Sequence, residues 1–223
     1  MLDHEFIAAP EKNSRHLWIM LHGLGDSIEG YRFMPEIMEL PWMNYLLVNA
    51  PDAYYQGFSW FDFDSDREGN IVPDVERSRP GVERSRRLLS ELLDAQRAKG
   101  FPASQTVLGG FSQGCLMSVD VGLRYPHRLA GIIGISGFVF EPERLLKELS
   151  PVAREQRLLL THGTYDPIFP ISKVRERIAL LKNAGLHIEF HALNKAHTIA
   201  GKEELKLLRD FVCAGVPAGE REV

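Results

Sequence analysis

Ser112 stands in a sequence context that could activate a hydroxyl group. It is the centre of a Gly-Phe-Ser-Gln-Gly run at 110–114, which follows an apolar run at 106–109 and precedes a helical pattern at 113–125. A Gly-x-Ser-x-Gly between a strand and a helix is a nucleophile elbow, a turn so tight that a Cβ at either flanking glycine would clash. So short a pattern also arises by chance, and Ser112 could be an ordinary turn serine. The strand–turn–helix context is what favours a nucleophile.

The chain also offers an acid and a histidine in a suitable order. Asp166 follows an apolar run at 157–162, and His197 follows another at 187–192. The order nucleophile, acid, histidine is that of α/β-hydrolases, and each spacing leaves room for a strand and a helix. Asp166 could instead be a turn aspartate, but its place after a strand end favours a site residue.

Each of these groups has a defined task in acyl transfer. A histidine, whose ordinary pKa lies near 6.5, takes the serine proton as the hydroxyl attacks. A carboxylate fixes the imidazole tautomer and stabilises the imidazolium. The oxyanion of the tetrahedral intermediate needs preorganised donors. We therefore predict a triad of Ser112, Asp166 and His197, with the backbone N–H groups of Leu24 and Gln113 as the oxyanion hole.

Other histidines and one cysteine have simpler interpretations. His187 and His191 fall inside a predicted strand and are expected to be packed or edge residues. His22 and His162 each precede a glycine at a strand end, where we expect them to fix loops by hydrogen bonding. Cys115 lies inside the predicted helix after the elbow and is expected to be a small buried residue. No ligand motif is present, so neither a metal nor an organic cofactor is expected.

A sheet must position these residues, because all of them follow predicted strands. Apolar runs alternate with helical patterns, which favours a mostly parallel, doubly wound sheet with helices on both faces and a site at the carboxyl ends of the strands. The expected strands are His16–Leu21, Tyr45–Asn49, Thr106–Gly109, Leu129–Ile135, Arg157–His162 and His187–Ala192. The expected helices are Val82–Lys99, Gln113–Tyr125, one capped by Ser172 that runs through Ala184 and is closed by Gly185, and Glu203–Ala214.

The 223 residues fit one α/β domain over 1–223, with a core at about 16–212 and no separate cap domain. The aromatic-rich stretch at 50–80 is expected to be an irregular loop, either functional or mobile. The tail after Gly215 is expected to fray. A run of arginines is expected to form a solvated helix face; its members are Arg77, Arg79, Arg84, Arg86 and Arg87.

Composition excludes several classes of function. A net charge of −4 with 25% charged residues does not favour binding to nucleic acid or anionic lipid. No apolar run approaches the roughly 18 residues of a membrane span, and the first ten residues lack the apolar region of a signal peptide. The two cysteines indicate a reducing compartment. We expect a cytoplasmic enzyme and leave a homodimer open.

Five motifs in order make the chain similar to a known family. Over about 16–212 it resembles the phospholipase/carboxylesterase family, which includes acyl-protein thioesterases. The resemblance implies an α/β-hydrolase fold, ester or thioester hydrolysis, and the triad and oxyanion roles given above. The motifs are Leu-His-Gly-Leu-Gly-Asp at 21–26, Trp60-Phe61-Asp62, the elbow at 110–114, His162-Gly163 with Asp166-Pro167 and Pro170, and the late His197.

Three features depart from the family pattern. Cys115 stands where the family usually has a glycine, and Ala196 replaces the glycine that usually precedes the histidine. The segment between the turn at 49–51 and Trp60 is short. The substitutions at Cys115 and Ala196 are expected to have little effect on the reaction, whereas the short segment bears on substrate preference.

The expected function is a serine hydrolase that cleaves short-to-medium acyl esters or thioesters through an acyl-enzyme, acting on a small ester or an acylated substrate. Trp60, Phe138 and Phe169 are candidate walls of a shallow substrate groove, although Trp60 could equally cover the core. Acyl-protein thioesterase and lysophospholipase activities are the alternatives within this class. A non-catalytic ligand-binding protein on the same fold is the alternative outside it.

Overall fold

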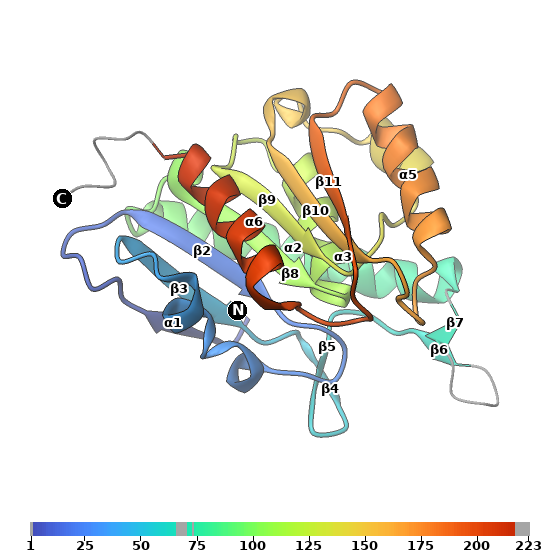
Figure 1. The fold of residues 1–223 in the computed structure, drawn as a ribbon, viewed down its shortest axis with the longest axis horizontal. Helices are drawn as coiled ribbons and strands as arrows, with labels where there is room; N and C mark the ends of the chain where they lie inside the picture. Colours follow the sequence, from blue (N-terminus) through green and yellow to red (C-terminus); the bar gives the residue numbers. More distant parts are fainter. Residues whose placement is uncertain (1, 66–70, 73, 217–223) are drawn as a thin grey trace.

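A seven-stranded sheet lies at the centre of the molecule (Figure 1). The computed structural model describes residues 2–65, 71–72 and 74–216. The strands, in spatial order, are β1 (His4–Ile7), β3 (Met43–Val48), β2 (His16–Leu21), β8 (Thr106–Phe111), β9 (Gly131–Ile135), β10 (Leu158–Gly163) and β11 (Ile188–Leu193). The edge strand β1 runs antiparallel to β3, and the other neighbours in the sheet pair in parallel.

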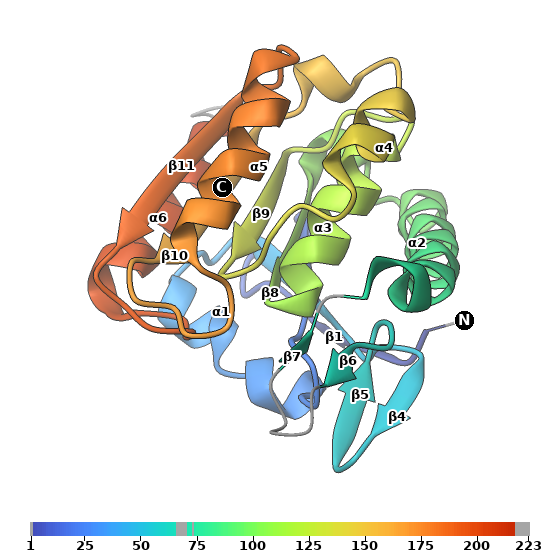
Figure 2. The same ribbon diagram turned by 90° about the vertical axis from the view of Figure 1, so that its right-hand side faces the viewer.

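Helices cover both faces of this sheet (Figures 1 and 2). Four of them lie on one face: α2 (Val75–Ala98), α3 (Gln113–Arg124), α4 (Pro142–Lys147) and α5 (Ile171–Asn183). On the other face lie α1 (Met34–Met38) and α6 (Gly201–Ala214). Single 3₁₀ turns occur at Ile28–Tyr31, Ala103–Gln105 and Ala153–Glu155.

Burial along the strands explains this layering. β2, β3, β9 and β10 are buried at every residue, as a sheet covered on both faces requires. On β2, Leu17 and Ile19 enter the core under α2 and α3, while Trp18 and Met20 enter the core under α1 and α6. The predicted mostly parallel sheet between two helical layers is confirmed, and the six predicted strands lie within two residues of the observed ones.

The stretch at 50–80 is more regular than the sequence analysis expected. It holds two small hairpins and the first turns of α2, which begins at Val75 because the Asp74 carboxylate accepts hydrogen bonds from the N–H groups of Glu76 and Arg77 at 3.0 and 3.1 Å. The helix then continues through Pro80. The hairpins are β4 (Asp52–Tyr54) with β5 (Gly57–Ser59), and β6 (Asp64–Ser65) with β7 (Ile71–Val72).

Smaller corrections concern the ends of elements. Helix α5 begins at Ile171, so Pro170 and not Ser172 occupies its N-cap position. Gly185 follows that helix with a φ of +86°, as predicted for a residue that must adopt a left-handed conformation. The predicted fraying of the tail concerns residues that, from 217 on, lie outside the described part. Within the described residues, no helix has both the length and the apolar character needed to cross a membrane.

The predicted arginine face is partly exposed to solvent, but three of its residues are half-buried and pair with distant acids. Arg79 binds Glu141 with two hydrogen bonds of 2.9 and 3.0 Å, Arg84 pairs with Asp52, and Arg86 pairs with Asp120. The sequence could not reveal these pairs because the acids lie far along the chain.

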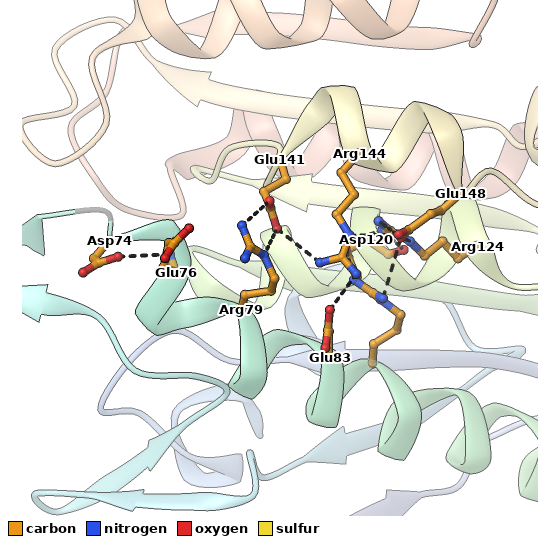
Figure 3. A network of polar contacts seen from close by, with 10 residues as sticks. Asp74, Glu76, Arg79, Glu83, Asp120, Arg124, Glu141, Arg144 and Glu148 are labelled. Atoms are coloured by element: carbon orange, nitrogen blue, oxygen red, sulfur yellow. Dashed lines mark hydrogen bonds and ion pairs between the residues drawn. The ribbon is translucent and has the colours of Figure 1, made fainter.

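A network of ion pairs continues from Arg79 and Glu141 across α2, α3 and α4 (Figure 3). Glu141 has a φ of +39° and occupies the N-cap position of α4, with its side chain turned to Arg79. Hydrogen bonds from Arg79 hold its pKa below the usual range despite partial burial. The network therefore fastens the segment that leads from β9 into α4, which also borders the site described next.

Candidate active site

Ser112 occupies the turn between β8 and α3 with a φ of +54° and a ψ of −114°. This conformation is rare for a residue with a side chain, so surrounding contacts must hold it. A Cβ at Gly110 would lie 2.4 Å from the carbonyl carbon of Gly114, and a Cβ at Gly114 would lie 2.1 Å from the carbonyl oxygen of Leu21. The Ser112 N–H donates to Ile135 O at 2.9 Å. The two flanking glycines are thus required for the close approach.

The structure brings the three predicted triad side chains together. His197 Nε2 lies 3.0 Å from Ser112 Oγ, and His197 Nδ1 lies 2.7 Å from Asp166 Oδ2. The three residues follow β8, β10 and β11, whose carboxyl ends meet at one edge of the sheet. The imidazole is 13% exposed and the carboxylate is fully buried, so solvent reaches the imidazole but not the carboxylate.

Asp166 is held as a carboxylate in its buried position. Burial alone would raise its pKa, but hydrogen bonds from Phe169 N–H, His197 and Ile168 N–H hold that pKa below the usual range. The two backbone donors bind Oδ1 at 3.0 and 2.8 Å, which leaves Oδ2 for the imidazole. An ionised acceptor at Nδ1 selects the tautomer whose Nε2 is free to accept the Ser112 proton.

The two residues predicted to form the oxyanion hole belong to segments that lie next to Ser112. Gln113 is the first residue of α3, where a helix leaves its N–H groups without an intrahelical acceptor. Leu24 is half-buried in the loop after β2, which passes so close that a Cβ on Gly23 would lie 3.3 Å from Ser112 Cβ. Hydrogen bonds of 2.9 Å tie this loop to both backbone groups of Phe58 on β5. The hairpin therefore fixes the loop that the sequence analysis assigned to the oxyanion hole.

His22 and His162 hold loops, as the sequence analysis expected. His22 Nδ1 donates to Gly23 O at 2.6 Å, and its Nε2 accepts from Ala50 N–H at 3.0 Å. His162 Nε2 donates to Phe169 O at 2.8 Å. Burial lowers the pKa of both imidazoles, which keeps them neutral at physiological pH.

Trp60 is a core residue and not a wall of the groove. Its side chain is 0% exposed, and its Nε1 donates to His22 O at 2.9 Å. The Gln113 side chain accepts a hydrogen bond from Trp60 N–H at 3.0 Å and donates one to Phe61 O at 2.8 Å. Of the two interpretations left open for Trp60, its burial supports core packing, because no surface remains for a substrate.

Cys115 is buried under the elbow, as predicted. Its sulfur fills the space beside Gly134 and Gly137, where a Cβ on either glycine would approach it within 2.6 Å. Burial raises the pKa of the thiol to about 12, so it stays protonated. The departure from the family pattern at this position therefore adds no second nucleophile.

A groove runs along the start of α5, next to the triad but lined by none of its three residues. The Phe169 ring lies 5.6 Å from the His197 ring, and the Phe138 ring lies 4.8 Å from that of Phe169. The groove has a volume of about 210 Å³ and is lined by Phe138, Ile168, Phe169, Pro170, Lys173, Val174 and Arg177. A wider hollow of about 500 Å³ near Trp42 is open to solvent and holds none of the triad groups.

The sequence analysis did not predict the buried ion pair between Lys195 and Glu204, which lies next to the loop of His197. Lys195 Nζ donates to Glu204 Oε1 at 2.5 Å and to Thr198 O at 2.8 Å, and Glu204 Oε2 accepts from Ala200 N–H at 2.6 Å. The two side chains are 2% and 0% exposed. The pair therefore pins both sides of the loop that carries His197.

A sequence signal for this pair existed. Glu204 lies on the same face of α6 as the buried Leu208 and Phe211, at a spacing of four and seven residues. A carboxylate on an apolar helix face requires a buried cation. Lys195, two residues before the histidine, was the available partner.

We expect Lys195→Met to lower kcat by roughly 10- to 100-fold with little change in KM, since a displacement of about 1 Å in a catalytic group can cost on the order of 10² in rate. The measurement is steady-state ester hydrolysis at a temperature where circular dichroism shows the variant folded. Lys206→Met, on the exposed face of α6, is the matched control and should match wild type. A folded Lys195→Met protein with wild-type kcat would contradict this role.

Comparisons with known proteins agree on one group. The model of the phospholipase/carboxylesterase family matches residues 2–214. Acyl-protein thioesterase 1 of Schizosaccharomyces pombe is 39% identical over 169 residues, which are 68% of this chain and 69% of that protein. Acyl-protein thioesterase 1 of Yarrowia lipolytica is 30% identical over 199 residues, covering 84% and 86%. The crystal structure of esterase PE8 has a TM-score of 0.86 at 26% identity and covers 96% of this chain and 99% of that one.

Proposed function

This chain belongs to the phospholipase/carboxylesterase family of α/β-hydrolases and is a carboxylic ester hydrolase, and we propose that Ser112, His197 and Asp166 carry its reaction. The observation that supports this most directly is the pair of hydrogen bonds, 3.0 and 2.7 Å long, that joins a strained serine to a buried carboxylate through one imidazole. We also propose that the whole chain acts as one domain.

In the first half-reaction, Ser112 Oγ attacks the acyl carbon while His197 Nε2 takes its proton. The carbonyl oxygen becomes an oxyanion, which the N–H groups of Leu24 and Gln113 bind. The intermediate then collapses, the bond from carbon to the leaving oxygen or sulfur breaks, and His197 gives its proton to that leaving group. Asp166 stabilises the imidazolium that exists between these two transfers.

In the second half-reaction, water replaces the departed alcohol or thiol. His197 takes a proton from the water as the water oxygen attacks the acyl carbon bound to Ser112. The ester bond to Ser112 breaks, and the proton returns to Ser112 Oγ. The product is a carboxylic acid, and the enzyme regains its starting protonation state.

The groove beside Phe138 and Phe169 is proposed to hold the acyl chain. Its volume is about 210 Å³, and five of its seven lining residues are apolar. Ile168, which is 37% exposed at its edge, adds an apolar contact surface. Acyl groups of short to medium length are therefore the proposed substrates.

We expect kcat/KM to rise from acetyl to about hexanoyl or octanoyl esters and then to flatten. Each buried CH₂ contributes about 0.8 kcal/mol, which is roughly a fourfold increase for each added carbon that the groove still contacts. The measurement is a series of p-nitrophenyl esters from C2 to C16, with acyl thioesters of the same lengths beside it. A steep rise that continues to C16 would contradict a short groove.

A second candidate function is deacylation of proteins, because the relatives from two yeasts are named acyl-protein thioesterases. The same series separates the two: a strong preference for long-chain thioesters favours the thioesterase, and efficient cleavage of hexanoyl or octanoyl oxygen esters favours the carboxylesterase. Turnover of no ester or thioester would instead favour a non-catalytic binding protein.

A further inference from the structure

Arg177 is a half-buried cation on the rim of the acyl groove. It lies on the second turn of α5, and its guanidinium carbon lies 4.8 Å from the centre of the Phe138 ring. Its Nη1 donates to Val139 O at 2.6 Å. Stacking and this bond hold the planar group in place beside the groove, while Nε and Nη2 make no other bond that is seen within the described residues.

This guanidinium has no carboxylate partner in the described part of the chain. Arg79 and Arg86, on the same side of the sheet, each pair with a carboxylate within 3.0 Å. Glu143 and Glu176 influence Arg177 only from beyond ion-pair distance, and burial lowers its pKa. A partly desolvated cation without a counter-ion favours the binding of an anion, and the guanidinium fork matches the two oxygens of a carboxylate.

The rest of the groove is apolar apart from Lys173, which already pairs with Glu176 at 3.2 Å. Lys173 lies one helical turn before Arg177, and therefore on the same side of α5. The other lining residues are Phe138, Ile168, Phe169, Pro170 and Val174. A ligand that fits this surface has an apolar chain that starts at the triad and a negative charge at its far end.

We propose that this groove selects acyl chains that end in a carboxylate, so that the preferred substrates are monoesters or monothioesters of dicarboxylic acids. The inference rests on the proposed function, since it places the acyl carbon at Ser112. An adipoyl group, which places four methylenes between its carbonyl carbon and a terminal carboxylate, is a chain of this kind and serves as the test case.

The test compares p-nitrophenyl hydrogen adipate with p-nitrophenyl heptanoate, whose acyl chains have similar size but differ in terminal charge. After subtraction of the uncatalysed rates, wild type should hydrolyse the adipate monoester with a kcat/KM at least tenfold higher. Arg177→Gln should lower kcat/KM for the adipate monoester at least tenfold more than it lowers kcat/KM for the heptanoate. The adipate preference should also shrink as salt rises, because salt screens the ion pair.

Arg175→Gln is the matched control, since Arg175 is exposed on the same helix and outside the groove. It should leave both rates unchanged. Equal kcat/KM for the two esters in wild type, or a parallel loss for both in Arg177→Gln, would overturn the proposal and leave Arg177 as a support for Phe138. If wild type hydrolyses neither ester, the proposed function itself fails. If it hydrolyses only the heptanoate, the proposed function stands and this inference fails.

Discussion

Replacing Ser112 with alanine is expected to lower kcat by about 10⁴-fold or more, because loss of a residue that acts as part of a catalytic unit removes nearly the whole effect of that unit. The fold should persist. Alanine keeps the Cβ that the elbow already accommodates, and among the described residues the hydroxyl bonds to His197 alone. The measurement is turnover of p-nitrophenyl hexanoate, with circular dichroism and thermal unfolding as checks on the fold.

Ser90→Ala is the control for this substitution. Ser90 lies on α2, where its hydroxyl donates to Arg86 O at 2.9 Å, far along the chain from the site. We expect wild-type kcat from it. Turnover by Ser112→Ala within tenfold of wild type would exclude this serine as the nucleophile.

Replacing Asp166 with asparagine should lower kcat by about 10⁴-fold, as expected for a base held in the wrong tautomer. The asparagine oxygen can still accept from the N–H groups of Ile168 and Phe169, so its NH₂ group faces His197 Nδ1. That nitrogen must then accept a hydrogen bond, which places the imidazole proton on Nε2, where the base is needed. Initial rates between pH 5 and 9 test this.

Comparing Asp166→Asn with wild type across this pH range separates an effect on the reaction from an effect on the stability of the fold. The pKa of Asp166 is lowered in the folded state, so its contribution to stability is present at neutral pH and is lost only as the pH falls through that lowered value. Between pH 5 and 9 wild-type Asp166 therefore stays ionised, so a change in activity across this range does not come from its protonation. Asp210→Asn, on an exposed part of α6, should show the wild-type profile. Wild-type kcat in Asp166→Asn would contradict the assigned acid.

Much of the fold was predictable because its signals are local. The continuous apolar run at 16–21 could only be a strand buried on both faces, and its burial confirms this. Gly110 and Gly114 allow the elbow to pack closely against its neighbours. A Cβ on Gly110 would meet Gly114 of α3, and a Cβ on Gly114 would meet Leu21 of β2. Residues at the carboxyl ends of parallel strands had to converge, and this convergence placed Asp166 and His197 beside Ser112.

The features that were missed depend on contacts between distant segments. The short edge strand β1 forms only by pairing with β3, and Arg79 and Arg86 of α2 pair with acids far along the chain. The start of α2 is an exception, since the Asp74 carboxylate that caps it is a local signal. The sequence leaves open whether Trp60 lines the groove or covers the core, because an aromatic residue near a site has the same pattern in both cases. Only the packing around Gln113 and His22 reveals its place in the core.

Covalent labelling tests the central claim most directly, namely that Ser112 is the nucleophile of an ester hydrolase. The protein is treated with a serine-directed fluorophosphonate, residual activity is followed, and the modified residue is located by peptide mass spectrometry. We predict one adduct on each chain, on Ser112, in proportion to the activity lost, and none on the Ser112→Ala variant. Full inactivation with Ser112 unmodified, or with the adduct on another residue such as Cys115, would contradict the account.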